Sequence, residues 1–90
     1  MDEIPKLRKQ IDAIDDQILV ALCERIKVCR AIGSAKKNQG KPVRDVSREN
    51  EVYIKIKEKA TQLGLNSGQV ESVYLEIVNM CSAVQEQRTL

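Results

Sequence analysis

The sequence predicts an all-α fold of three helices, and two observations support this class. Apolar residues recur at alternating intervals of three and four along most of the chain, and no segment alternates apolar and polar residues with the two-residue period of a strand. Two glycine-containing breaks, at 40–42 and 64–68, divide this pattern into three segments. The 90 residues are expected to form one domain, 1–90, without repeats or low-complexity segments.

The first predicted helix begins at Ile4 and is unusually long. About 36 residues span roughly 54 Å, whereas a globule of this chain length has a radius of gyration of about 12 Å. Lys36 and Lys37 suit the negative end of the helix dipole, and Gly40 with Pro42 ends the helix. We therefore expect an intertwined homodimer that shares the long helices, in which a second copy covers the exposed apolar seam. That seam consists of Ile4, Leu7, Ile11, Ile14, Ile18, Ala21, Val28, Ile32 and Ala35.

Two shorter helices are predicted to follow. The second begins near Asp45 or Val46, with Asp45 as its N-cap, and the third follows the turn at 64–68, where Asn66 and Gln69 have the spacing of a capping box. Both carry an apolar stripe at helical spacing. The stripes are Val46, Tyr53, Ile56, Ala60 and Leu63 in the second helix, and Val70, Tyr74, Ile77, Cys81 and Val84 in the third.

Composition argues against several classes of function. The net charge of +2 comes from 15 basic and 13 acidic residues mixed along the chain, and only two tyrosines are available for base stacking, so nucleic-acid binding is not expected. The three cysteines, Cys23, Cys29 and Cys81, form no CxxC pair and have no histidine to join them in a metal site. We predict that all three are unpaired small hydrophobic residues.

The same reasoning predicts a cytoplasmic protein that does not bind membranes. The segment MDEIPKLRKQ lacks the apolar run of a signal peptide, and no stretch approaches the roughly 20 apolar residues of a membrane span. The short chain is also expected to leave no room for a separate regulatory domain.

Charged residues occupy positions where the helical pattern calls for apolar ones. Arg25 lies on the seam of the first helix, and Glu49 lies on the inner stripe of the second. Because an unpaired buried charge costs several kcal/mol, something must compensate each of them. The two residues are either a buried ion pair that fixes helix register or part of a charged site.

Further residues favour a site for an anion with two separated charges. Lys36 follows Arg25 by eleven residues, so both cations point the same way, roughly 16 Å apart. Arg8 lies about 25 Å before Arg25 along the helix and about 100° away in angle, so it cannot serve the same pocket within one chain. In an antiparallel dimer that shares the long helices, it could serve the partner's pocket. Gln85 adds a neutral hydrogen-bond donor beside the seam of the third helix.

Each of these residues also has a purely structural interpretation. Lys36 is then a partner of the helix dipole, and Asp45 and Arg48 are surface charges at a helix N-terminus. Gln85 is then a polar residue at the edge of the seam. Taken together, however, their placement favours the site.

Several sequence blocks resemble the small all-helical chorismate mutases. The blocks are LRKQIDAIDDQIL, the pair ER at 24–25, IGSAK ending at Lys36, PVRDVSRE, and a third helix that closes with Gln85. Their spacing matches that family without gaps over nearly the whole chain. The resemblance implies a dimeric enzyme that converts chorismate to prephenate on the route to phenylalanine and tyrosine.

The resemblance also implies roles for individual residues. Arg8 corresponds to an arginine that binds a substrate carboxylate in the other protomer's pocket, and Arg25 to an arginine that binds a carboxylate within its own. Lys36 and Gln85 correspond to the two donors that hydrogen-bond the ether oxygen of the breaking bond.

The resemblance assigns roles to four further residues. Arg48 matches a further cationic wall residue, and Asp45 and Glu49 match an acidic pair near the substrate hydroxyl. Cys81 stands where a small polar residue, often serine, touches a carboxylate, although a thiol is a weak donor. We further expect Glu49 to offset the charge of Arg25 while the site is empty.

The chemistry that the resemblance implies suits this set of residues. The rearrangement is intramolecular and pericyclic, so it needs no nucleophile, proton transfer, metal or cofactor, and the sequence has no histidine. Two alternatives stay open. One is an isochorismate pyruvate-lyase, which uses a similar cationic pocket, although PVRDVSRE looks more like the mutases. The other is a helical dimerisation module without catalysis, in which the charged seam residues only set register.

Overall fold

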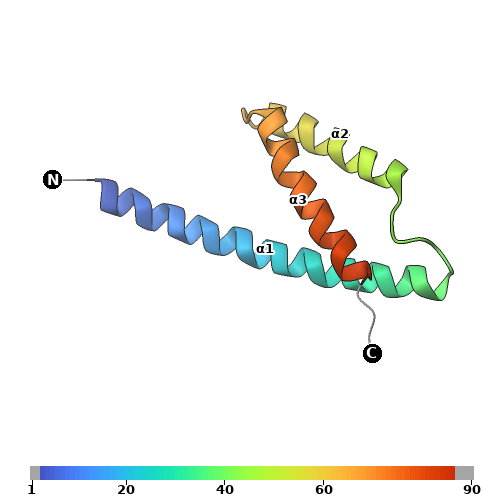
Figure 1. The fold of residues 1–90 in the computed structure, drawn as a ribbon. Coiled ribbons are helices and arrows are strands. Elements are labelled where there is room, and N and C mark those ends of the chain that lie inside the picture. Colours follow the sequence, from blue (N-terminus) through green and yellow to red (C-terminus); the bar gives the residue numbers. More distant parts are fainter. Residues whose placement is uncertain (1–2, 87–90) are drawn as a thin grey trace.

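The computed structural model describes residues 3–86 and contains three α-helices within them (Figure 1). They are α1 (Ile4–Asn38), α2 (Val46–Gln62) and α3 (Ser67–Glu86). No strand occurs in these residues, so the prediction of an all-α fold is confirmed. None of the described helices is both long enough and apolar enough to cross a membrane.

The long helix α1 has 35 residues and ends where the sequence predicts. Gly40 adopts a left-handed backbone conformation with φ of 67°. The Lys41 N–H then donates to the Lys36 carbonyl at 2.8 Å, and the Gly40 N–H donates to the Lys37 carbonyl at 3.2 Å. These two bonds satisfy carbonyls that the end of a helix otherwise leaves unpaired, so the helix stops at a defined residue.

The two shorter helices begin at side-chain caps. Asp45 accepts a hydrogen bond from the Arg48 N–H at 3.0 Å, as predicted, and Asn66 accepts one from the Gln69 N–H at 2.9 Å. Between them, Gly64 (φ 76°) ends α2 in the same way that Gly40 ends α1. The predicted turn at 64–68 extends too far, because Ser67 already belongs to α3.

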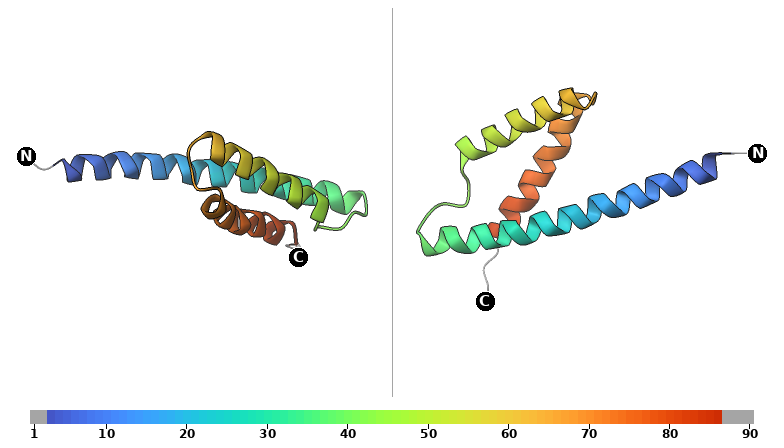
Figure 2. Two further views of the ribbon diagram at one scale, coloured as in Figure 1. Left: turned by 90° about the horizontal axis from the view of Figure 1, so that it is seen from above. Right: turned by 180° about the vertical axis from the view of Figure 1, so that it is seen from behind.

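Helix α3 joins the other two helices. It packs against both α1 and α2, which do not pack on each other within the described residues. Figures 1 and 2 show α3 crossing α1 in its C-terminal half, while the N-terminal half of α1 extends away from the rest of the chain. The described chain is accordingly elongated, with principal extents of 61 × 31 × 14 Å and a radius of gyration of 16.7 Å.

A single chain has very little core. Among the described residues, only Cys29, Ala60 and Val78 are buried hydrophobic residues. The apolar stripe of α3 is half-buried, but Val46 and Leu63 at the two ends of the α2 stripe are exposed. Every residue of the α1 seam is exposed as well, including the large side chains of Ile4, Leu7, Ile11, Ile14, Ile18, Val28 and Ile32. With so small a core, a single chain is marginally stable unless another chain contributes apolar surface.

The prediction for the cysteines is wrong in two respects. Cys29 and Cys81 form a disulfide between α1 and α3, with Cα atoms 5.3 Å apart. Cys23 is unpaired, as predicted, but exposed rather than packed as a small hydrophobic residue. The paired cysteines are separated by 52 residues in the sequence. Their pairing depends on which faces of two helices meet, and no local pattern reports that.

Candidate active site

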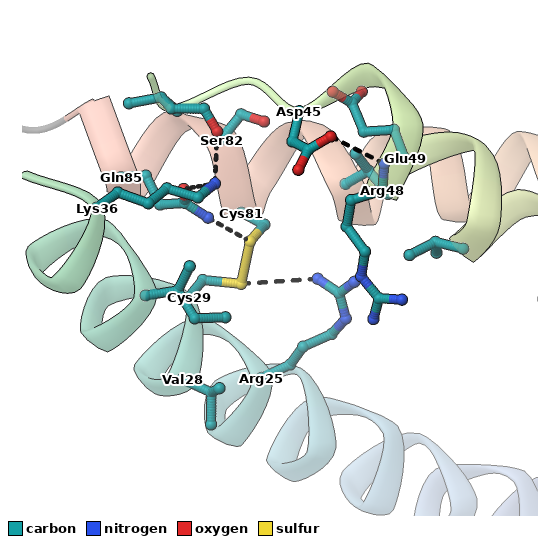
Figure 3. A pocket seen from close by; sticks show the side chains of 14 residues that line it. Arg25, Val28, Cys29, Lys36, Asp45, Arg48, Glu49, Cys81, Ser82 and Gln85 are labelled. Atoms are coloured by element: carbon teal, nitrogen blue, oxygen red, sulfur yellow. Dashed lines mark hydrogen bonds between the residues drawn. A yellow bond between two sulfur atoms is a disulfide. The ribbon is translucent and has the colours of Figure 1, made fainter. Parts of the chain in front are cut away.

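A cavity of about 430 Å³ lies where α1, the start of α2 and the end of α3 approach one another (Figure 3). This volume lies within the range of small-molecule sites, roughly 300–1,000 Å³. Valines and Ile32 supply its apolar wall. The lining also includes seven of the predicted site residues, namely Arg25, Lys36, Asp45, Arg48, Glu49, Cys81 and Gln85.

Arg8 is the one predicted residue that this cavity does not include. It lies on the exposed N-terminal part of α1, which extends away from α2 and α3. Its distance from Arg25 along the helix is about 25 Å, as expected from the sequence. The predicted role of Arg8 therefore requires a second chain.

Lys36 and Gln85 form a direct pair at one end of the cavity. The Lys36 ammonium donates to the Gln85 side-chain oxygen at 2.9 Å and to the Val43 backbone carbonyl at 2.6 Å. Lys36 and Gln85 are both half-buried. Because an ammonium has three N–H groups, one more remains for a ligand in the cavity.

The disulfide lies in the cavity wall and contacts two of the predicted donors. The Gln85 amide nitrogen donates to the Cys81 sulfur at 3.1 Å, and the Arg25 guanidinium donates to the Cys29 sulfur at 3.7 Å (Figure 3). Since a disulfide has no S–H group, Cys81 has no thiol proton to offer a carboxylate in this state.

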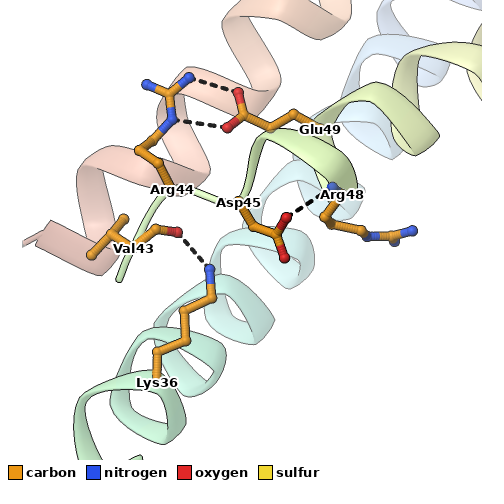
Figure 4. A network of polar contacts seen from close by, with 6 residues as sticks. All are labelled: Lys36, Val43, Arg44, Asp45, Arg48 and Glu49. Atoms are coloured by element: carbon orange, nitrogen blue, oxygen red, sulfur yellow. Dashed lines mark hydrogen bonds and ion pairs between the residues drawn. The ribbon is translucent and has the colours of Figure 1, made fainter. Parts of the chain in front are cut away.

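Glu49 pairs with a residue other than the predicted one. Its carboxylate accepts from Arg44 Nε at 2.9 Å and from Arg44 Nη2 at 2.6 Å, in a two-pronged ion pair (Figure 4). The Glu49 side chain is 17% exposed and that of Arg44 is 54% exposed. The hydrogen bond from Arg44 lowers the pKa of Glu49, although burial opposes the shift. Glu49 is thus already compensated before any ligand binds.

The structure contradicts one of the two interpretations of these charges, a buried ion pair between Arg25 and Glu49. Both oxygens of Glu49 are engaged by Arg44, which comes from the loop before α2. Arg25 is half-buried on α1 and donates to Cys29. The helical period correctly indicated which face of α2 carries Glu49, but it cannot report a partner that a loop supplies.

Asp45 and Arg48 combine a structural role with a place in the cavity wall. Asp45 caps α2 through its hydrogen bond with the Arg48 N–H, as the structural interpretation predicts. The Arg48 guanidinium forms an exposed ion pair with Glu51 at 3.2 Å. In Figure 3 the Arg48 side chain extends from α2 toward the side of the cavity where Arg25 enters from α1. The lining therefore contains three cations, Arg25, Lys36 and Arg48.

Residues that the sequence did not single out also shape the site. A Cβ atom at Gly33 would lie 3.0 Å from both Cα and Cγ of Gln85, which is tighter than nearly all Cβ contacts, so glycine allows α1 to approach α3 this closely without displacing Gln85. An isolated glycine inside a helical pattern was the available signal. The sequence carried no such signal for the pairing of Arg44, because Arg44 lies outside α2 and its spacing from Glu49 is not that of a helical pair.

The arrangement suits an anionic ligand. The lining has three cations against two carboxylates, and Glu49 is already paired with Arg44. Lys36 and Gln85 can both direct hydrogen bonds to one developing negative charge. Within residues 3–86, no group of three or more His, Cys, Asp or Glu side chains is placed to hold a metal ion.

Comparison with known proteins places these observations in a family context. The sequence profile of the family described as chorismate mutase type II matches residues 7–86. The chain is 32% identical over 90 aligned residues to a bifunctional chorismate mutase/prephenate dehydratase of Aquifex aeolicus, with 97% of this chain and 25% of that protein aligned. It is 32% identical over 82 residues to a 3-dehydroquinate dehydratase of Pyrobaculum aerophilum, with 91% and 24% aligned.

A third relative has a length close to that of this chain. The match to a chorismate mutase of Methanocaldococcus jannaschii is 24% identical over 87 residues, with 97% of this chain and 88% of that protein aligned. The chain thus spans about a quarter of the length of the first two relatives and most of the third.

Proposed function

Because the chain belongs to the chorismate mutase type II family, we propose that it isomerises chorismate to prephenate in the phenylalanine and tyrosine branch of aromatic amino-acid biosynthesis. The family profile spans most of the chain, and the proposed domain is 1–90. The observation that carries the proposal is the cavity in which Lys36 and Gln85 form one donor pair with Arg25 and Arg48 in the same wall.

The proposed reaction asks two things of a protein. One C–O bond breaks and one C–C bond forms within a single dianion, and no proton is transferred. The protein must hold the flexible substrate in its reactive shape and stabilise the negative charge that grows on the ether oxygen. Fixed cations and amides accomplish both tasks.

We assign the stabilisation of the ether oxygen to Lys36 and Gln85. The Lys36 ammonium is held by the Val43 carbonyl and the Gln85 oxygen, so little reorganisation is needed when charge develops. The amide of Gln85 has two N–H groups, of which one donates to Cys81. The second is the donor that we assign to the substrate.

The remaining residues are proposed to bind the rest of the substrate. Arg25 binds one carboxylate, because a guanidinium can donate two parallel hydrogen bonds to a carboxylate and so fix its orientation. Arg48 forms a further cationic wall, and Asp45 and Glu49 lie near the substrate hydroxyl. Cys81 contributes to the wall through its contact with Gln85.

The proposal includes a homodimer in which Arg8 binds the second carboxylate in the partner's pocket. The exposed seam of α1 and the three-residue core support this, because a second copy would cover apolar surface that one chain leaves in water. We also propose a cytoplasmic location, where a disulfide such as Cys29–Cys81 is a transient, redox-sensitive state rather than a permanent one.

The direct test is to incubate the purified chain with chorismate and, in a separate assay, with isochorismate, and to measure prephenate and pyruvate in both. Prephenate without pyruvate is the expected result. Release of pyruvate from isochorismate, with no prephenate from chorismate, would instead identify the pyruvate-lyase. If neither product forms and chorismate does not raise the melting temperature, the chain is a dimerisation module without a site.

A further inference from the structure

The Cys29–Cys81 disulfide joins the helix that carries Arg25 and Lys36 to the helix that carries Gln85. Both of its sulfurs accept a hydrogen bond from a proposed substrate-binding donor. We propose that this disulfide is a positioning element for Gln85, and that its redox state sets the rate of the reaction. The rate effect rests on the proposed function, whereas the positioning of Gln85 does not.

The two ends of the Gln85 amide have chemically different partners. The amide nitrogen donates to the Cys81 sulfur at 3.1 Å, and the oxygen accepts from the Lys36 ammonium at 2.9 Å (Figure 3). Since an ammonium only donates and a disulfide sulfur only accepts, these partners select one of the two amide orientations. The selected orientation keeps the oxygen on Lys36 and leaves one N–H for the cavity.

The backbone geometry places the disulfide and the Gln85 contact on successive turns. Gly33 follows Cys29 by four residues, and Gln85 follows Cys81 by four residues. At the first turn, the disulfide joins α1 to α3, and the Cα atoms of its two cysteines are 5.3 Å apart. One turn further along each helix, a Cβ atom on Gly33 would lie 3.0 Å from Gln85. The covalent link therefore maintains the close approach against which Gln85 is packed.

Reduction of the Cys29–Cys81 disulfide changes both the chemistry of the two sulfurs and the spacing between α1 and α3. A thiolate of a dithiol reductant attacks one sulfur and displaces the other cysteine, which takes up a proton; the second thiol of the reductant then releases the first cysteine. Two electrons and two protons reach the protein, and the reductant becomes a disulfide. A small-molecule disulfide, such as oxidised glutathione, reverses the exchange.

The reduced form is expected to be the slower one. Two thiols cannot remain at the covalent distance of about 2 Å, so the sulfurs separate and the contact around Gln85 loosens. A misplacement of about 1 Å in a catalytic arrangement can cost up to roughly 100-fold in rate. We expect kcat to fall at least about tenfold on reduction, with a smaller change in KM.

The test compares oxidised and reduced full-length chain, with thiols counted after denaturation in each sample. One thiol, from Cys23, is expected before reduction and three afterwards. Cys23→Ser should keep the redox response, and Cys29→Ser should abolish it. The proposal is overturned if three thiols are present even after treatment with oxidised glutathione, or if kcat changes less than twofold between the two verified states.

A second readout separates positioning from a merely structural role. The side-chain amide resonances of Gln85, identified by their loss in Gln85→Ala, should shift on reduction of the wild type. If activity falls only in proportion to the folded fraction, and these resonances do not move, the disulfide is structural. Should neither redox state convert chorismate, the proposed function fails, and the resonances still decide whether the disulfide positions Gln85.

Discussion

Glu49 and Arg44 set the electrostatic state of the cavity rim. The carboxylate of Glu49 is mostly enclosed and accepts two hydrogen bonds from Arg44, whose guanidinium lies at the surface. The hydrogen bond from Arg44 is the main reason that the pKa of Glu49 is lowered. The acid that faces the cavity is consequently kept ionised by a residue outside the cavity.

This pair predicts how stability depends on pH. Because the folded-state pKa of Glu49 is lowered, its stabilising contribution is complete above the unfolded value of about 4.3 and is lost as pH falls through the folded pKa. Arg44→Gln should remove much of this dependence. Urea unfolding of both proteins at a series of pH values below 5.5 checks this. Parallel stability curves for the two proteins would contradict it.

Lys36 is the residue whose removal should affect chemistry most directly. It is held by two acceptors beside the cavity, as an oxyanion donor would be. Lys36→Ala should lower kcat on the order of 100-fold to 1000-fold, the usual cost of one such donor.

The neighbouring Lys37 provides a matched control. It is exposed and absent from the cavity lining, so Lys37→Ala should leave kcat close to that of the wild type. Steady-state kinetics on chorismate, with circular dichroism to verify folding, measure both variants. Equal losses from the two substitutions would refute the assignment of Lys36.

Residues of the site could be predicted from the sequence where their helix fixes their direction. Arg25, Lys36 and Glu49 were placed by counting along a helix, and all three line the cavity. Pairings across the chain were not predictable in this way. The Cys29–Cys81 disulfide depends on how two distant helix faces meet, and the Arg44–Glu49 pair depends on the path of a loop.

At the scale of elements, the crossing of α1 and α3 matters most to the site. Gly33 removes a side chain at the crossing, and Gln85 occupies the space. Helix boundaries were readily predicted, because glycine, proline and capping residues act within one turn. The crossing itself was not predictable, because it depends on how side chains of two helices fit together.

Substitution of Gly33 tests the crossing. Gly33→Ala should favour α1 intrinsically, by about 1 kcal/mol in helix propensity, yet its methyl group must push Gln85 away. We expect kcat to fall by up to about tenfold, because Gln85 must shift by a few tenths of an ångström and a misplacement of about 1 Å can cost roughly 100-fold. Ser34→Ala is the control, because Ser34 is exposed and outside the cavity. Unchanged kinetics in Gly33→Ala would mean that the contact does not position Gln85.

At the scale of the whole molecule, the described chain is elongated and has little core of its own. Its extents of 61 × 31 × 14 Å and its three buried hydrophobic residues leave most apolar side chains in water. The length of α1 was the sequence feature that predicted this shape. The sequence could not give the relative placement of two chains, because the seam residues specify an apolar stripe but not its partner.

Mixing two inactive variants tests whether pockets are shared between chains. In the proposed homodimer, a chain with Arg8→Ala keeps its own Lys36 and can receive Arg8 from a partner carrying Lys36→Ala. One of the two pockets in such a mixed dimer is then complete. Co-refolding equal amounts should recover about a quarter of wild-type activity, because half of randomly formed dimers are mixed and half of their pockets are intact.

The control mixes two variants whose substituted residues, Lys36 and Gln85, both belong to the pocket of their own chain. Mixing Lys36→Ala with Gln85→Ala leaves one damaged donor in every pocket of a mixed dimer, so activity should not recover beyond the mean of the separate variants. Activity assays after co-refolding, with sedimentation to verify dimers, measure both mixtures. If the Arg8 mixture also stays at that mean, Arg8 does not complete the pocket of a partner chain, and the exposed N-terminal half of α1 requires another explanation.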